Sequence, residues 1–304
     1  MIDKKTGVLL MNFGAPERPE DVEAFVTHIC HGLKPPDHVL NLVKEKYSLM
    51  EGGSPLITTT MAQAKGLELE LKRQGKNYPV YIGMLHSPPF IVDVVGQMIE
   101  NGMERLLAIS LAPFYSEVST GAYYACVREA VANSPSDVSV SYGAEWNTHP
   151  SFIDAWVKRI SCSLRGFSHP EEVNLIFTTH SLSMEPIEDT SGYQRQYQAT
   201  VNALKEKLPC GKVHLTYQSK GKRSGKWLSP QVDEVIEKLT KVGEKSVLAV
   251  PIGFVADHLE TLYDLDIEIK KQAELGGIDF RRITTFNDHP DFIKFLAELV
   301  LARE

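Results

Sequence analysis

The chain has 304 residues, of which 43% are hydrophobic and 23% charged, with a formal net charge of −7 at pH 7; this composition is typical of a globular protein with about two domains. The acidic balance excludes a typical nucleic-acid-binding protein, which needs a basic surface. The longest apolar run, residues 106–115, is too short to span a bilayer, and the charged residues 1–7 do not form a signal peptide. We expect a cytoplasmic, monomeric protein that binds no nucleic acid and has no stable association with membranes.

Apolar segments rich in β-branched residues alternate with amphipathic segments along the whole chain. The apolar segments predict strands at residues 7–11, 80–84, 105–111, 173–178, 212–218 and 246–251. The amphipathic segments predict helices at residues 18–27, 60–74, 91–101, 122–133, 194–207, 230–241, 257–274 and 291–302. This alternation indicates an α/β fold with parallel, doubly wound sheets.

An internal repeat divides the chain into two similar halves. Residues 146–160 read WNTHPSFIDAWVKRI, and residues 286–300 read FNDHPDFIKFLAELV. In both segments a His-Pro pair stands where an amphipathic helix begins, a position at which proline needs no N–H donor. We expect two Rossmann-like lobes, residues 1–150 and 151–304, which face a central cleft, with the C-terminal helix packing back on the first lobe.

The cysteines do not form a recognisable metal motif. Cys30, Cys126, Cys162 and Cys210 lie tens of residues apart without a C-x-x-C pair. Neither a zinc knuckle nor an iron–sulfur cluster is predicted, and we expect reduced, mostly buried thiols. No glycine-rich phosphate loop follows the first predicted strand, so the sequence predicts no nucleotide site.

A row of carboxylates follows the last predicted strand. The strand at residues 246–251 leads through a turn at Gly253 into a helix that carries Glu260, Asp264 and Glu268, and their spacing of four places them on one side. Ligands of α/β proteins bind beyond the carboxyl ends of strands, so this row begins at a predicted cleft. It predicts a cation site or a proton path. The alternative is the solvated acidic face of a helix whose apolar residues pack inward.

His180 is the second candidate functional residue. It ends the strand within NLIFTTHSLS, residues 174–183. A lone histidine there is more often a structural hydrogen-bonding group. In a doubly wound sheet, however, His180 and Glu260 both follow strands of one sheet and can face each other. This pair suits transfer of a divalent transition metal, or general base catalysis if burial raises the pKa of Glu260 toward neutrality.

Aromatic residues on loops predict a slot for a flat aromatic ligand with acidic edges. Each of them alone could be a core residue. The candidate residues are Phe13, Lys46, Tyr47, Ser54, Ser119, Tyr123, Tyr124 and Trp227, with the basic cluster Lys220, Lys222, Arg223 and Lys226 beside the last.

These residues lie in motifs that resemble the ferrochelatase family, and within it the bacterial enzymes without an iron–sulfur centre that use coproporphyrin III. Members insert ferrous iron into a porphyrin. The resemblance spans nearly the whole chain and includes MNFGAP (11–16), GGSPL (52–56), YIGMLHSPPF (81–90), LAPFYS (111–116), THSL (179–182), QSKG through KWLSP (218–230) and the very specific PIGFVADHLETLYDLDIE (251–268). It implies a chelatase fold of two lobes.

The resemblance also implies roles for single residues. His180 and Glu260 would be the metal-handling pair, and Asp264 and Glu268 an outer acidic path or secondary metal site. The implied porphyrin contacts are Phe13, Lys46, Tyr47, Ser54 and Tyr123, to which we add Trp227. Fe²⁺ would be a substrate, and no tightly bound cofactor is expected.

Four features depart from the family pattern and concern the choice of porphyrin more than the reaction. Phe13 stands where relatives that use coproporphyrin often have Tyr, and a phenyl ring cannot ligate iron. Cys30 and His31 replace basic residues, and Ser183 replaces a proline. Residues 220–226 are unusually basic and could hold propionates instead.

The sequence therefore predicts a ferrochelatase of haem biosynthesis that acts on coproporphyrin III, binds the macrocycle in a bent form and admits Fe²⁺ from the side of His180 and Glu260. Which of the two residues accepts the pyrrole proton is left open. Protoporphyrin IX remains the nearest alternative substrate. Cobalt or nickel chelation into sirohydrochlorin would favour histidine ligands and more basic residues. A non-catalytic tetrapyrrole carrier would need neither His180 nor Glu260.

Overall fold

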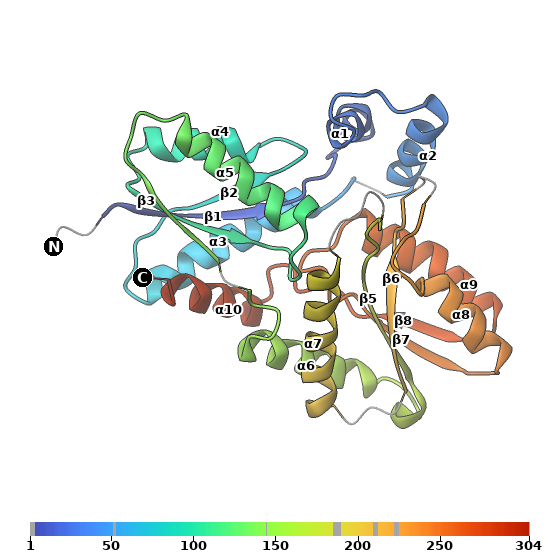
Figure 1. Cartoon of the computed structure of the whole chain (residues 1–304). Coiled ribbons are helices and arrows are strands. Elements are labelled where there is room, and N and C mark those ends of the chain that lie inside the picture. Colours follow the sequence, from blue (N-terminus) through green and yellow to red (C-terminus); the bar gives the residue numbers. More distant parts are fainter. Residues whose placement is uncertain are drawn as a thin grey trace. The chain divides into compact units, whose positions relative to one another are not determined.

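The computed structural model describes residues 4–50, 53–143, 145–184, 190–208, 212–221 and 225–303. Within them, strands form two parallel four-stranded sheets with the orders β2-β1-β3-β4 and β6-β5-β7-β8 (Figure 1). The strands are β1 (Thr6–Asn12), β2 (Val80–Met84), β3 (Arg105–Ser110), β4 (Ser139–Tyr142), β5 (Asn174–His180), β6 (Lys212–Gln218), β7 (Ser246–Val250) and β8 (Asp279–Arg282). The two sheets share one strand order, as the internal repeat predicted.

All the predicted strands are present. The sequence missed β4 and β8, which are four-residue edge strands with the sequences SVSY and DFRR. Neither contains the apolar run by which a buried strand is recognised. The inner strands do contain one: residues 8–11 of β1 are completely buried, because helices cover both faces of its sheet.

Most helices agree with the prediction. The helices are α1 (Val22–Ile29), α2 (Asp37–Ser48), α3 (Leu56–Arg73), α4 (Ile91–Glu100), α5 (Ala122–Ala132), α6 (Pro150–Leu164), α7 (Ser191–Lys207), α8 (Val232–Lys241), α9 (Lys270–Leu275) and α10 (Pro290–Leu301). Helix α2 was not predicted, since only Leu40 and Tyr47 of it are buried. The single helix expected at residues 257–274 is instead a π-helix, η4 (Glu260–Ile269), followed by α9.

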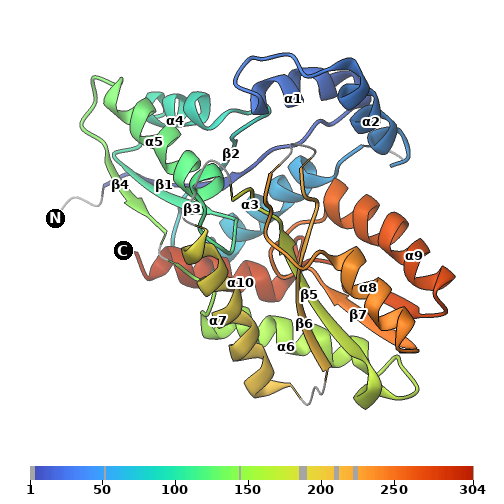
Figure 2. The same ribbon diagram turned by 45° about the vertical axis from the view of Figure 1, so that its right-hand side comes forward.

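Residue contacts divide the chain into two units. Unit 1 comprises Met1–Ala112, Glu117–Ala144 and Phe286–Glu304, and unit 2 comprises Pro113–Ser116 and Glu145–Thr285. In unit 1, α4 and α5 cover one face of the sheet and α3 and α10 the other (Figure 2). In unit 2, α6 and α7 cover one face, and α8 and α9 the other. The C-terminal helix α10 thus packs against α3 of unit 1.

The repeated His-Pro pairs cap two helices in the same way. The Nδ1 atom of His149 accepts a hydrogen bond from the backbone N–H of Ser151 at 3.3 Å, and that of His289 accepts one from Asp291 at 3.2 Å. In both helices proline occupies the first turn. The repeat therefore encodes the starts of α6 and α10. Among the described residues, no helix is both long and apolar enough to cross a membrane.

Candidate active site

His180 and Glu260 form the centre of the candidate site in unit 2. His180 is the last residue of β5, and Glu260 is the first residue of η4, which follows the neighbouring strand β7. The Nδ1 atom of His180 lies 2.9 Å from Oε2 of Glu260, and the side chains are 37% and 28% exposed. The predicted proximity of the two side chains is therefore confirmed. An imidazole and a carboxylate in this arrangement can share a proton or bind one divalent transition metal.

The two groups form an ion pair when His180 is protonated. Burial would lower the pKa of His180, but the charge of Glu260, its hydrogen bond and the charge of Asp264 outweigh burial and raise that pKa. Burial would also raise the pKa of Glu260, but His180 and His258 outweigh it and hold that pKa well below its usual range. The expectation that burial shifts the pKa of Glu260 toward neutrality is therefore wrong, because two histidines face this carboxylate.

Of the carboxylates of η4 in the predicted row, Glu260 and Asp264 are partly buried and Glu268 is exposed. Asp264 is partly buried and accepts a hydrogen bond from the Ser219 hydroxyl at 2.5 Å, whereas Glu268 is exposed. Thr261 and Leu265 form the buried side of the same helix. An order from half-buried to exposed is what an outward proton path needs, and that role of Asp264 and Glu268 stays a prediction.

Two further residues contact Glu260 and were missed in the sequence. The Nε2 atom of His258 lies 3.6 Å from Oε2 of Glu260, and its Nδ1 atom is buried without a hydrogen-bond partner among the described residues. The side-chain amide of Gln218, at the end of β6, donates to the backbone carbonyl of Glu260 at 2.7 Å. The available signals were the spacing of His258 two residues before Glu260, and the position of Gln218 at a strand end.

The end of β5 is fixed on two sides. Gly253, in the turn after β7, lies directly against Thr179: a Cβ atom there would be 2.1 Å from Oγ1 and 2.8 Å from Cα of Thr179. The Tyr193 hydroxyl, which lies 2.5 Å from Thr179 Oγ1, donates to the carbonyl of His180 at 3.0 Å. Since a phenol has one proton, the Thr179 hydroxyl donates to Tyr193. These contacts fix the backbone that carries His180.

Trp227 lies beside the same end of β5. Ser183 pairs with Trp227 through an antiparallel bridge, and the backbone N–H of Met184 donates to the carbonyl of Lys226 at 2.8 Å. The Trp227 ring is partly buried and packs against Gly221. The structure thus brings Trp227 to the edge of the sheet at which β5 ends.

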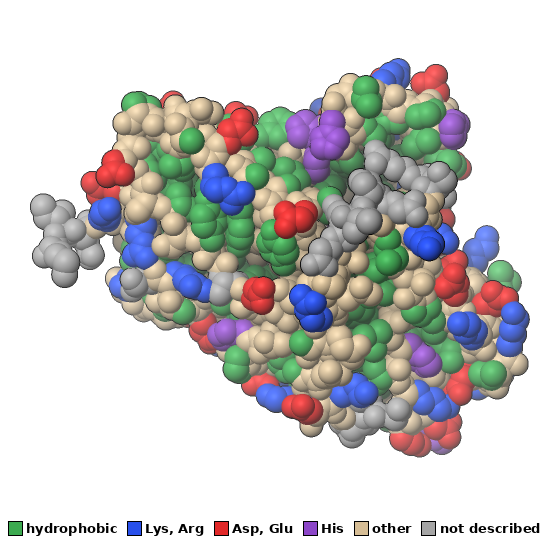
Figure 3. Space-filling view, in the orientation of Figure 1, with side chains coloured by type: hydrophobic (Ala, Val, Ile, Leu, Met, Phe, Trp, Pro, Cys, Tyr) green, Lys and Arg blue, Asp and Glu red, His purple; other side chains and the backbone are tan. Residues whose placement is uncertain are grey.

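Phe13 lies in a cluster of aromatic rings in unit 1. Its ring centroid is 4.5 Å from that of His86, and Nδ1 of His86 is 2.9 Å from Nδ1 of His28. Phe25 and Phe90 complete the cluster, 6.3 Å from Phe13 and 5.2 Å from His28, respectively. Figure 3 shows histidine side chains gathered at α1. A hollow of about 380 Å³ there is lined by Ala24, Thr27, His28, His31 and Gly32.

The other predicted porphyrin contacts in unit 1 are more deeply buried. Tyr47, Ser54 and Tyr123 are 3%, 5% and 2% exposed, and Tyr123 belongs to the core around β1 and β3. The Ser54 hydroxyl accepts a hydrogen bond from the backbone N–H of Leu56 at the start of α3. Contact of these three residues with a porphyrin stays a prediction that requires their surroundings to open. Lys46, in the last turn of α2, is partly exposed.

His86 gives the aromatic cluster a pH dependence. Burial, His28 and His31 lower the pKa of His86 from 6.5 to about 4. Between these pH values the unfolded chain binds a proton at His86 that the folded protein does not, so the stability contributed by this residue falls as the pH decreases from about 6.5 to about 4. We expect His86→Phe to reduce the loss of stability between about pH 7 and pH 5, measured as the midpoint of urea unfolding.

The exposed His38 of α2 provides the control, and we expect His38→Asn to leave the pH dependence of the midpoint unchanged. An unchanged pH dependence in His86→Phe would contradict the prediction. It would mean that His86 is as easily protonated in the folded protein as in the unfolded chain.

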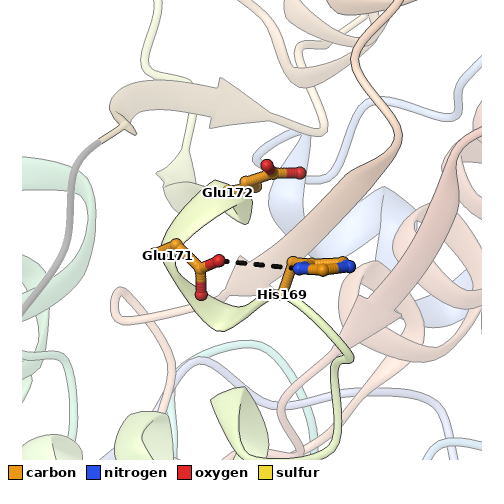
Figure 4. Close-up of side chains that lie close together, drawn as sticks. All are labelled: His169, Glu171 and Glu172. Carbon is orange, nitrogen blue, oxygen red and sulfur yellow. Dashed lines mark ion pairs between the residues drawn. The ribbon is translucent and has the colours of Figure 1, made fainter.

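Another group of possible metal ligands lies at the opposite end of β5. His169, Glu171 and Glu172 stand together just before this strand begins, and Nδ1 of His169 is 3.6 Å from Oε1 of Glu171 (Figure 4). All three are exposed. Because exposed carboxylates of this kind commonly bind no ion, we assign no role to the group.

The remaining sequence expectations concern cysteines and the basic cluster. Cys30 and Cys126 are half-buried and Cys162 is exposed, all as free thiols, so the expectation of mostly buried thiols is wrong for these three. Lys220 and Lys226 are exposed. The predicted positions Gly52, Cys210, Lys222 and Arg223 lie outside the described residues.

The two parallel four-stranded sheets with helices on both faces define an α/β fold of the chelatase type. The fold is similar to that of SirB from Bacillus subtilis solved with Fe³⁺, with a TM-score of 0.64 and 14% identity, covering 98% of this chain and 95% of that one. At such low identity the similarity concerns the fold alone.

Sequence comparison defines the family. The ferrochelatase family profile matches residues 5–304. The chain is 34% identical over 308 residues to the coproporphyrin III ferrochelatase of Oceanobacillus iheyensis, covering 100% of this chain and 98% of that protein. It is 33% identical over 312 residues to the ferrochelatase of Thermus thermophilus, covering 97% and 98%. The chain therefore belongs to the ferrochelatase family, and it is an enzyme that inserts ferrous iron into a porphyrin in haem biosynthesis.

Proposed function

We propose that the porphyrin substrate is coproporphyrin III and that His180 and Glu260 handle the metal. The full-length similarity to a relative named coproporphyrin III ferrochelatase supports the substrate. The single observation that carries the proposed site is the 2.9 Å contact between His180 Nδ1 and Glu260 Oε2, at adjoining ends of β5 and η4. Sirohydrochlorin chelation and a non-catalytic carrier have no comparable support, because the family match spans the chain.

The two residues have different roles in this proposal. The lowered pKa of Glu260 keeps it a carboxylate, which suits an anionic ligand for Fe²⁺ but makes it a poor base. The raised pKa of His180 makes its neutral imidazole the stronger base of the pair, so His180 accepts a pyrrole proton. One Fe²⁺ enters the macrocycle and two pyrrole protons leave, so charge is conserved. Asp264 and Glu268, increasingly exposed along η4, pass the protons toward solvent.

The proposed porphyrin contacts include two aromatic rings. Phe13 offers a ring held by the aromatic cluster of unit 1, and Trp227 offers a partly buried ring near the end of β5 in unit 2. Lys46 and the exposed Lys220 and Lys226 provide positive charge for carboxylates of the substrate. We also propose that the enzyme works in the cytoplasm as a monomer.

The substrate is tested by anaerobic incubation of the purified chain with Fe²⁺ and either coproporphyrin III or protoporphyrin IX. We expect a kcat/KM at least ~10-fold higher for coproporphyrin III, because its additional carboxylates form ion pairs that protoporphyrin IX cannot form. Absorbance changes on metal insertion give both rates.

Equal rates, or faster insertion into protoporphyrin IX, would contradict the substrate assignment without affecting the metal site. Binding of both porphyrins without insertion of iron would instead indicate a carrier. Insertion of cobalt or nickel into sirohydrochlorin alone would favour that third alternative.

A further inference from the structure

Arg282 is a buried cation that binds both sides of the segment carrying Glu260. It is the last residue of β8, and its side chain is 4% exposed. Its Nη1 donates to Oδ1 of Asp257 at 2.8 Å, and its Nε and Nη2 donate to the two carboxylate oxygens of Asp266 at 2.7 Å each. The contact with Asp266 is therefore bidentate, an arrangement that fixes direction as well as distance.

The two carboxylates flank Glu260 in the sequence. Asp257 lies three residues before it, in the turn that leads to η4, and Asp266 lies within η4. The same Oδ1 atom of Asp257 accepts a hydrogen bond from the Thr261 hydroxyl at 3.1 Å. Arg282 thus connects the end of β8 to Asp257 and to Asp266 in the same segment. Glu260 lies between these two residues in the sequence.

This segment needs contacts from outside, because it is a π-helix. A π-helix is rare and usually only one turn long, because its backbone geometry is less favourable than that of an α-helix. On the side of β6, Gln218 donates to the carbonyl of Glu260 at 2.7 Å, and Ser219 donates to Asp264 at 2.5 Å. Arg282 supplies the attachment on the side of β8. The helix is therefore held between the ends of two strands that lie at opposite edges of the sheet.

We propose that Arg282 is a positioning residue for iron insertion: by binding Asp257 and Asp266 it sets the place of Glu260 relative to His180. This inference rests on the proposed role of Glu260. Arg282 contacts neither iron nor porphyrin in it and acts only through the two carboxylates. Groups that orient metal ligands in this way typically change metal affinity or activity by about 10- to 100-fold when they are removed.

The neighbouring Arg281 provides a matched control on the same strand. It binds Asp279 at 3.1 and 2.7 Å and packs over the ring of Phe167, and its side chain is 44% exposed. Among the described residues, its side chain makes no contact with η4. Replacing it changes the charge of β8 without releasing the segment that carries Glu260.

The experiment compares full-length variants, with rates expressed per folded protein. Arg282→Lys keeps the charge but loses the bidentate contact, and the triple variant Arg282→Met/Asp257→Asn/Asp266→Asn removes all three charges and leaves none of them buried alone. For both we expect kcat/KM for Fe²⁺ to fall at least ~10-fold, while the Kd for coproporphyrin III changes less than ~2-fold. For Arg281→Met we expect parental values.

The outcomes separate this inference from the proposed site. If the triple variant inserts iron at the parental rate while Glu260→Gln is inactive, Arg282 has only a structural role, and the proposed site stands. If activity falls only in proportion to the folded fraction, the inference is likewise wrong. If Glu260→Gln retains the parental rate, the proposed site fails, and the inference fails with it.

Discussion

Glu260→Gln is expected to lower the rate of iron insertion by at least ~100-fold while porphyrin binding persists. The substitution keeps the size of the side chain but removes the negative charge that pairs with His180 at 2.9 Å. In the proposed site, porphyrin binding depends on aromatic and cationic residues elsewhere, so its Kd should stay close to the parental value. Anaerobic insertion rates and porphyrin titration, measured on the same protein, check both parts.

Two substitutions along η4 serve as graded controls for Glu260→Gln. We expect Asp264→Asn to have a smaller effect, because water can partly replace a relay group farther from the chemistry. Glu268→Gln, at an exposed position, should have the smallest effect. If Glu260→Gln turns over at a near-parental rate, the metal site lies elsewhere and the carboxylates of η4 are only a surface row.

Gly253→Ala is expected to be the most damaging change outside the charged residues. A Cβ atom at this position would lie 2.8 Å from Cα of Thr179, which is backbone and cannot move aside easily. We expect the free energy of unfolding to fall by ~1–3 kcal/mol, the usual scale for overpacking. Because Thr179 precedes His180, displacement of the strand end by about 1 Å should also lower iron insertion by about 100-fold.

Gly96→Ala is the matched control for the glycine substitution. Gly96 lies within α4, and a Cβ atom there would have no heavy atom within 4 Å. Alanine in a helix interior is favoured over glycine by roughly 0.5–1 kcal/mol, so we expect a small increase in stability and unchanged activity. Denaturant unfolding and insertion rates are the measurements. Parental activity in Gly253→Ala would show that the end of β5 tolerates displacement.

The proximity of His180 and Glu260 could be predicted because parallel sheets have a simple rule. Each predicted strand had a clear apolar run, and parallel strands all end at the same edge of their sheet. Two polar residues that follow neighbouring strands therefore come close without any knowledge of side-chain packing. The inner strands β5 and β7, from which these residues follow, were both recognised from the sequence.

The type of helix and the contacts around Glu260 could not be predicted in this way. The π-helix receives contacts from the ends of β6 and β8, and β8 was missed because two of its four residues are arginines. His258 lies two residues before Glu260, about 200° away on a regular helix, so periodicity predicts no contact between them. Because the contact with His258 was not predicted, the pKa of Glu260 was expected to rise, whereas it is lowered.

The place of α10 has a consequence for the order in which the protein is completed on the ribosome. The segment Phe286–Glu304 belongs to unit 1, and Phe292, Phe295 and Leu296 of α10 are fully buried there. Unit 2 is complete once Thr285 has been synthesised, whereas unit 1, although its first segment precedes unit 2, lacks one of its covering helices until Pro290–Leu301 has been synthesised. Nascent domains generally fold in order from the N-terminus. In this chain the second sheet has all its helices before the first.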